Sequence, residues 1–141
     1  MRYYLDTNII VFLYTNHFDD ISSHVGNLIG DCSNTLYTSS VCIMELIHLG
    51  QIGKLFHKQK MHQSMLDDVF KWLTEQDIKI VPPNESHLKV MALLPFYEDH
   101  RDPCDRIIIS QAINDRIALI SSDHKFERYE RSGLEFIFNE R

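Results

Sequence analysis

Short runs of apolar residues, each ending at a polar or turn-forming residue, recur along the chain and predict buried β-strands. The first run ends at the carboxylate of Asp6, and another is followed closely by Asp123. Prolines close a third run at its carboxyl end, which limits how far that strand can extend. The predicted strands are residues 2–6, 36–39, 78–81, 118–121 and 134–138.

Between these runs the apolar residues recur at intervals of three and four, which predicts amphipathic helices. The strongest helical pattern lies between residues 57 and 75, where Met61, Met65, Val69 and Trp72 share one face. Three other helices are predicted over residues 8–17, after Asp19 and Asp20, and over residues 40–50. Two more are marked by their first residues: one is capped by Asn84 and ends before Pro95, and one begins at Asp102 and Pro103.

Strands that alternate with helices predict an α/β fold, here a three-layer sandwich with a mostly parallel central sheet. No repeat, linker or low-complexity tract interrupts the chain, so a single domain over residues 1–141 is expected. Ligands of such sheets bind at the carboxyl ends of the strands, where the following helices begin. Polar residues at those ends are therefore the first candidates for a functional site.

Acidic residues occupy several of these strand ends. Asp6 and Asp123 each follow a predicted strand, Glu45 lies in about the second turn of a helix, and Asp105 lies in the first turn of another. If the strands are neighbours, these carboxylates face one cavity and repel one another. Oxygen ligands of this kind bind Mg²⁺ or Mn²⁺, and two such ions can drive hydrolysis of a phosphodiester through an activated water.

Each acid taken alone also has a purely structural interpretation. Asp6 and Asp102 are placed to cap helices, and Asp105 suits the third position of a cap at Asp102. Asp123 suits an ordinary turn, and a lone helical glutamate such as Glu45 is more often solvated than catalytic. The joint placement of the acids is what favours a functional site.

The motifs that contain these acids resemble those of PIN domains, most closely the VapC-type toxins of bacterial and archaeal toxin–antitoxin pairs. The matching pieces are Leu5-Asp6-Thr7-Asn8-Ile9, Glu45 within Met44-Glu45-Leu46, His100-Arg101-Asp102-Pro103-Cys104-Asp105-Arg106 and Ser121-Ser122-Asp123. The chain departs from the family pattern at Cys104, where a large aromatic residue is common, and at Ser121, where a threonine is usual. Neither departure removes a carboxylate.

The resemblance implies a Mg²⁺-dependent endoribonuclease, with Mn²⁺ as a substitute, that acts on RNA and is held inactive by an antitoxin. It assigns metal binding and catalysis to Asp6, Glu45, Asp105 and Asp123, and it implies a homodimer. We assign substrate contacts to Asn8, Arg106 and Ser121, which adjoin these acids. A housekeeping PIN nuclease of RNA processing and a non-catalytic PIN-like binding module are the alternatives.

Other readings of the chain are weaker. His57 and His62 are five residues apart, a spacing that does not place both on one helix face, and no zinc-protease motif occurs. Asn8 replaces the second acid that a haloacid-dehalogenase motif needs, and prolines follow the strand where a receiver domain carries its phosphoacceptor. His100 and His124 flank the acids, and a phosphate contact by either one stays open.

The composition limits how such a protein could meet RNA. The net charge is −6, so broad electrostatic attraction is excluded and bound metal or a local patch around Lys54, Lys58 and Lys60 would have to receive phosphate. Three well-separated cysteines indicate no disulfide framework, which fits a reducing cytoplasm. The longest apolar run near the start, residues 9–14, is shorter than a signal-peptide core or a membrane span.

Overall fold

The computed structural model of the protein describes residues 1–56 and 62–141 and contains a five-stranded sheet in the order β3-β2-β1-β4-β5. Every neighbouring pair of strands is parallel, so the predicted parallel sheet is confirmed. The strands are β1 (Arg2–Leu5), β2 (Thr35–Ser39), β3 (Ile78–Val81), β4 (Ala118–Ser121) and β5 (Phe136–Phe138).

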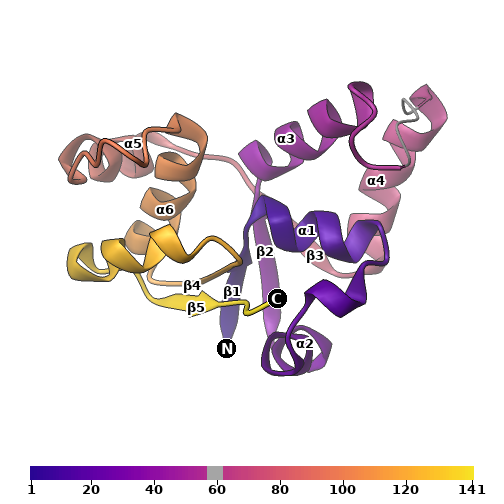
Figure 1. Ribbon diagram of the computed structural model, residues 1–141, viewed down its shortest axis with the longest axis horizontal. Coiled ribbons are helices and arrows are strands. Elements are labelled where there is room, and N and C mark those ends of the chain that lie inside the picture. The colour runs from indigo at the N-terminus through magenta and orange to yellow at the C-terminus, as the bar shows by residue number, and fades with distance from the viewer. Residues whose placement is uncertain (57–61) are drawn as a thin grey trace.

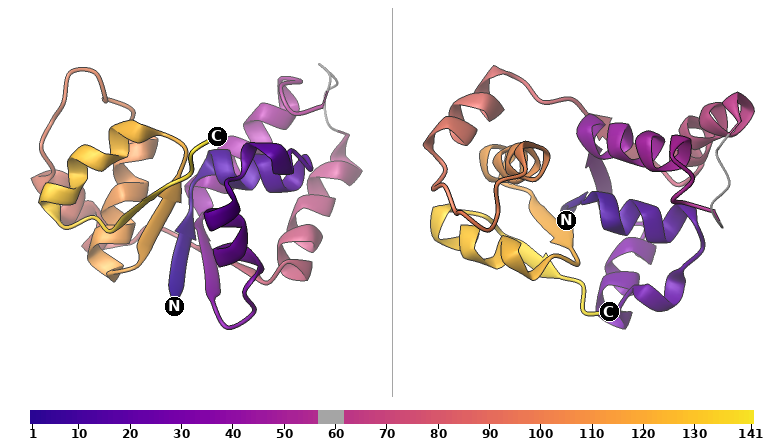
Figure 2. Two further views of the ribbon diagram at one scale, coloured as in Figure 1. Left: turned by 60° about the horizontal axis from the view of Figure 1, so that its bottom comes forward. Right: turned by 45° about the horizontal axis from the view of Figure 1, so that its top comes forward.

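Helices cover both faces of the sheet and complete the predicted three-layer sandwich (Figures 1 and 2). The helices of the first half pack on one face, and the later ones pack on the other. The first group is α1 (Thr7–Tyr14), the 3₁₀ turn η1 (Phe18–Asp20), α2 (Ser23–Gly30), α3 (Ser40–Gln51) and α4 (Gln63–Glu75). The second is α5 (Glu85–Leu93), α6 (Pro103–Asp115) and the 3₁₀ helix η2 (His124–Ser132).

Alternating side chains of the central strands enter two separate apolar cores. In β1, Tyr3 and Leu5 join the core beneath α1, α3 and α4, whereas Tyr4 joins the core beneath α6 and η2. In β4, Ile120 and Leu119 divide in the same way. Successive side chains of a strand point to opposite faces, and a sheet covered on both faces needs apolar residues at every position. This requirement explains the continuous apolar runs in the sequence.

Side chains at the carboxyl edge of the sheet cap the helices that begin there. Asp6 caps α1 and Ser39 caps α3, each by accepting a hydrogen bond from a backbone N–H in the first turn. Asp102 caps α6 ahead of Pro103 at the first helical position, as predicted. Asp123 caps η2. The chain therefore turns sharply from strand or loop into helix at the places where the acids lie.

Some boundaries differ from the predictions. The helix expected over residues 8–17 spans Thr7–Tyr14, and α4 begins at Gln63, while residues 57–61 of its predicted range lie outside the described residues. The last strand begins at Phe136 rather than Leu134. Sequence reasoning missed η2, because a 3₁₀ helix has a three-residue period that a search for helical faces at 3.6 does not detect.

Strand order places a switch point between β1 and β4. From β1 the chain continues to β2 on one side, whereas β4 pairs with the other side of β1 and leads on to β5. The crevice outside the carboxyl ends of such a strand pair is the usual ligand site in open α/β sheets. No helix among the described residues is long and apolar enough to cross a membrane.

Candidate active site

Asp6 lies at the switch point, directly after β1, and is 4% exposed. Its Oδ1 accepts a hydrogen bond from the Thr7 backbone N–H at 2.8 Å. Its Oδ2 accepts one from the Ser121 hydroxyl at 2.6 Å and another from the Asn8 amide at 3.2 Å. Burial raises the pKa of Asp6 to about 6, although the hydrogen bonds from Ser121 and Thr7 act in the opposite direction. The carboxylate is thus fixed in orientation but costly to ionise.

Asn8 and Ser121 join the ends of β1 and β4. The Asn8 amide nitrogen donates to the Ser121 hydroxyl oxygen at 3.2 Å, and its carbonyl accepts from the Ser122 N–H at 3.1 Å. The Ser121 oxygen also accepts from the Asp123 N–H at 3.0 Å. Ser121 is fully buried, so the structure contradicts its predicted substrate contact and makes it a residue that positions Asp6. The substrate role of Asn8, which is partly exposed, stays a prediction.

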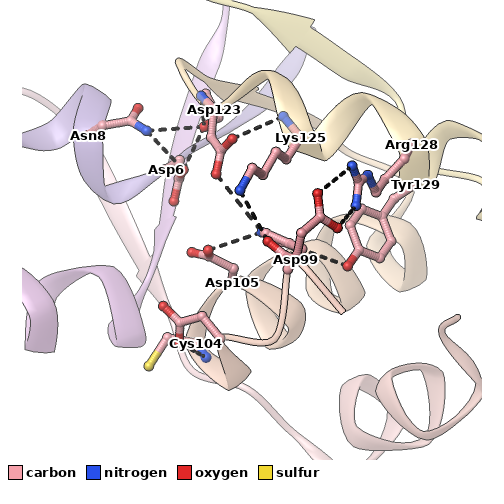
Figure 3. A network of polar contacts seen from close by, with 12 residues as sticks. Asp6, Asn8, Asp99, Cys104, Asp105, Asp123, Lys125, Arg128 and Tyr129 are labelled. Atoms are coloured by element: carbon pink, nitrogen blue, oxygen red, sulfur yellow. Dashed lines mark hydrogen bonds and ion pairs between the residues drawn. The ribbon is translucent and has the colours of Figure 1, made fainter. Parts of the chain in front are cut away.

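Asp105 projects from the first turn of α6 toward Asp6 and Asp123 (Figure 3). Its Oδ2 lies 3.2 Å from Nε2 of His100. Burial, followed by the nearby carboxylate of Asp6, raises the pKa of Asp105 to about 8. In contrast, Asp102 is exposed and accepts the Cys104 N–H at 2.9 Å. The two acids of this motif therefore have separate roles, one at the site and one at the helix cap.

Glu45 reaches the same region from the second turn of α3. Its Oε1 accepts a hydrogen bond from the Thr7 hydroxyl at 2.8 Å, so Thr7 ties α1 to the glutamate. Burial raises the pKa of Glu45 above its usual range. Sequence reasoning did not single out Thr7, although its place between Asp6 and Asn8 was the available signal.

The four predicted acids line one cavity of about 370 Å³, together with Thr7, Asn8, Val11, Phe12, Leu49 and Arg141. Their predicted convergence is therefore confirmed. Three of them, Asp6, Glu45 and Asp105, have raised pKa values, with burial as the largest cause in each case. Carboxylate oxygens that repel one another in a partly dry cavity are the donor set that a hard divalent cation stabilises, so the residues present fit Mg²⁺ or Mn²⁺.

Arg106 lies away from this cavity, contrary to its predicted substrate role. Its guanidinium donates to the carbonyl of Pro95 at 2.8 Å and to that of Leu94 at 3.4 Å, and it packs over the Phe96 ring. Only 7% of the residue is exposed. A guanidinium with these buried partners is not presented to substrate, and the arginine instead fastens the segment after α5 to α6.

Other residues that the sequence placed near the site have different outcomes. Burial raises the pKa of the Cys104 thiol, which keeps it protonated and unsuited to act as a nucleophile. His124 is exposed on η2, whereas His100 is buried against the acids. Lys54 is exposed, and Lys58 and Lys60 of the predicted basic patch lie outside the described residues. Arg141, far from every motif, was missed because no local pattern marks it.

The sequence model of the PIN domain family matches residues 3–132, and the chain belongs to that family. A search of curated proteins found no match. Among solved structures, the fold is similar to that of VapBC2 from Rickettsia felis bound to a DNA fragment from its promoter. The sequence identity is 20% and the TM-score is 0.70, with 99% of this chain and 100% of that chain covered. VapBC-1 of nontypeable Haemophilus influenzae shares 23% identity at a TM-score of 0.67, with 98% of each chain covered. DNA-bound VapBC of Salmonella typhimurium shares 18% identity at a TM-score of 0.69, again over 98% of each chain.

Proposed function

We propose that the protein is a metal-dependent endoribonuclease that hydrolyses RNA phosphodiesters, with Asp6, Glu45, Asp105 and Asp123 holding Mg²⁺. The observation that supports this proposal is the convergence of these carboxylates on one cavity at the switch point of a parallel sheet. Membership of the PIN family supports it independently. Mn²⁺ is the expected substitute, because it accepts the same oxygen donors.

The residues of the chain prepare the cavity for this chemistry. Ser121 and Asn8 hold the Asp6 carboxylate in place, and Thr7 holds Glu45. The bound ion would supply an activated water and stabilise the charge that develops on the phosphate oxygens. Asp105 carries a proton at neutral pH in the metal-free cavity and must release it when a cation binds, because metal ligands bind deprotonated.

The biological role that we propose is that of a toxin held inactive by a cognate antitoxin. PIN family membership and the likeness in fold to toxin–antitoxin complexes support this role. A homodimer and a cytoplasmic location belong to the same proposal. An acidic cavity attracts arginine or lysine, so we expect the antitoxin to place a cationic side chain over Asp6 and Asp105.

Cleavage of defined RNAs by the purified protein tests the proposal. Transfer RNA, a ribosomal RNA fragment and a messenger RNA transcript should be assayed with Mg²⁺, with Mn²⁺ and with EDTA. We expect cleavage only with the metals, and water attack predicts products with 5′-phosphate and 3′-hydroxyl ends. Activity undiminished in EDTA, or products ending in 2′,3′-cyclic phosphate, would contradict the metal-activated water.

The Asp6→Asn variant distinguishes a nuclease from a binding module. Asparagine keeps the size and much of the hydrogen bonding of Asp6 but removes the charge that binds a cation. We expect this variant to fold and to lose cleavage by at least about a hundredfold, the scale on which removal of one positioned electrostatic group acts. RNA binding without cleavage in the wild type under all metal conditions would instead favour the non-catalytic module.

A further inference from the structure

His100 is a buried imidazole at the edge of the acidic cavity, and the proposed chemistry has not used it. It is 5% exposed and lies between the ring of Phe126 and the ring of Tyr129, each with its centroid 5.4 Å away. Its Nδ1 is 2.8 Å from the Tyr129 hydroxyl. These contacts fix the plane of the ring and direct its other nitrogen toward the acids.

That other nitrogen, Nε2, lies 3.2 Å from Oδ2 of Asp105 and 4.0 Å from Oδ2 of Asp123. His100, Asp105 and Asp123 each offer one ligand atom, and these atoms all lie within 4.8 Å of one another. In octahedral coordination, ligands about 2.1 Å from a divalent ion are separated by about 3.0 Å when adjacent and about 4.2 Å when opposite. Both distances from Nε2, 3.2 Å and 4.0 Å, fall close to these values, so one ion can contact all three groups once the carboxylates adjust around it.

We propose that His100 is a metal ligand, and that it binds a divalent ion through Nε2 together with Asp105 and Asp123. The role of that ion in catalysis rests on the proposed function. The histidine adds a nitrogen ligand to a cluster that otherwise offers only oxygen ligands. Imidazole suits transition metals better than it suits Mg²⁺. This end of the cavity therefore selects Mn²⁺ over Mg²⁺, and Asp6 and Glu45 form its all-oxygen end.

The surroundings of His100 match those of histidines that bind metals. Such a histidine usually makes a hydrogen bond through its second ring nitrogen, and that bond fixes the tautomer and the orientation of the ring. The Tyr129 hydroxyl fills this role, since a hydroxyl can donate to a bare Nδ1 or accept from a protonated one. Tyr129 is itself fully buried, so the ring and its partner form one rigid unit.

The competing explanation is that His100 only positions Asp105 through a hydrogen bond and does not bind metal. Pulsed electron paramagnetic resonance of bound Mn²⁺ distinguishes a metal ligand from such a positioning residue. The full-length protein is stripped with EDTA, dialysed and loaded with one equivalent of Mn²⁺, without RNA. A histidine ligand couples its ¹⁴N nucleus strongly to the Mn²⁺ electron spin through the metal–nitrogen bond, whereas a positioning residue outside the coordination sphere gives only a weak through-space coupling. We expect the strong coupling in the wild type.

Two glutamine substitutions are matched for this experiment. His100→Gln should lose the nitrogen coupling and bind Mn²⁺ at least about tenfold more weakly by titration calorimetry, with a smaller loss for Mg²⁺. His124→Gln, at an exposed neighbour of Asp123, should keep both the coupling and the Mn²⁺ affinity. Circular dichroism checks the fold of each variant, and His100→Asn replaces His100→Gln if the latter does not fold.

Absence of nitrogen coupling in Mn²⁺-loaded wild type, or its persistence in the folded His100 variant, would overturn the inference. Wild-type protein labelled with ¹⁵N only at histidine gives a test that needs no substitution, because the coupling must then change to the ¹⁵N pattern. All of these measurements omit RNA. A negative result for the nitrogen ligand therefore does not bear on RNA cleavage. Absence of RNA cleavage likewise does not bear on the nitrogen coupling.

Discussion

Two acids in one short motif, Asp102 and Asp105, show how far apart the roles of neighbouring residues can be. Asp102 is exposed and bonds to the backbone of its own helix, whereas Asp105 is largely buried and faces Asp6. We expect Asp105→Asn to abolish RNA cleavage with the fold retained, and Asp102→Asn to keep measurable activity, because asparagine caps a helix about as well as aspartate. Cleavage assays and thermal melts on both variants check this.

The helix cap formed by Asp102 gives a second measurement, protein stability, that distinguishes Asp102 from Asp105. Asp102→Ala removes the side chain that accepts the Cys104 N–H, and it should lower the free energy of unfolding by about 0.5–2 kcal/mol. If Asp102→Asn is as inactive as Asp105→Asn at equal stability, Asp102 belongs to the active site and the division of roles is wrong.

The raised pKa of Asp105 makes the metal-free protein sensitive to pH. The carboxyl holds its proton up to about pH 8 when folded but releases it near pH 3.8 when unfolded. Between these values the folded state binds more protons, so its stability falls as the pH rises. Asp105→Asn removes this contribution, and in EDTA its melting temperature should exceed that of the wild type by at least about 3 °C at pH 8, with a smaller difference near pH 5.

Addition of Mg²⁺ is the control for this pH experiment. Binding of a cation favours the carboxylate, so saturating Mg²⁺ should stabilise the wild type and reverse the order of the two proteins at pH 8. Equal melting temperatures in EDTA across the pH range would show that Asp105 ionises freely and that the carboxylates do not repel one another.

At the level of secondary-structure elements, Arg106 joins the segment after α5 to α6 through side-chain hydrogen bonds. Its guanidinium bonds to the carbonyls of Leu94 and Pro95, just after α5, while its backbone belongs to the first turns of α6. Residues 106–112 are all buried, so α6 runs through the second core rather than along the surface. This burial explains why the helix carries so little amphipathic pattern in the sequence.

We expect Arg106→Met to lower the free energy of unfolding by about 1.5–3 kcal/mol, the usual scale for lost hydrogen bonds to a charged group. Well below its melting temperature, its kcat/KM for RNA should stay within about threefold of the wild type. Arg101→Met is the matched control, because Arg101 also packs on Phe96 but its side chain is 65% exposed. A stable Arg106→Met protein with strongly reduced kcat/KM would restore the substrate role.

At the level of the whole molecule, the negative net charge limits contacts with RNA phosphates. Some of the exposed cations in the described residues face an acid. These pairs are Lys71–Glu75, Lys89–Glu85, Arg101–Glu98 and Arg141–Asp20, and the partly exposed Arg128 pairs with Asp99. For the proposed RNA substrate, we therefore expect affinity to come mainly from metal bound in the cavity and from few direct phosphate contacts.

This balance predicts a weak dependence of cleavage on salt. With about two phosphate contacts, kcat/KM at fixed Mg²⁺ should fall by about tenfold between 50 and 200 mM KCl, whereas six to ten contacts would cost several hundredfold or more. Initial rates on one short RNA over this range give the slope. A steep slope would reveal a basic RNA track that compensates for the acidic surface.

The sequence by itself determined the features that depend on neighbours along the chain. The period of apolar residues located the strands and most helices, and cap chemistry marked Asn84 and Asp102 at helix starts. Ligands bind at the carboxyl ends of parallel strands, and this rule was enough to predict that Asp6, Glu45 and Asp123 line one cavity. These inferences hold because backbone geometry and capping are decided within a few residues.

Only the tertiary structure decided which distant residues touch. The pairing of β1 with β4 brings Ser121 against Asp6 across 115 positions, and no local pattern encodes that pairing. The same holds for His100, which Tyr129 and Phe126 orient from a 3₁₀ helix that follows β4. Arg106 looked like a substrate contact because it follows Asp105, but a residue's neighbours in the chain do not determine which face of a buried helix it occupies. Contacts of this kind arise from packing between elements, and packing depends on the whole chain at once.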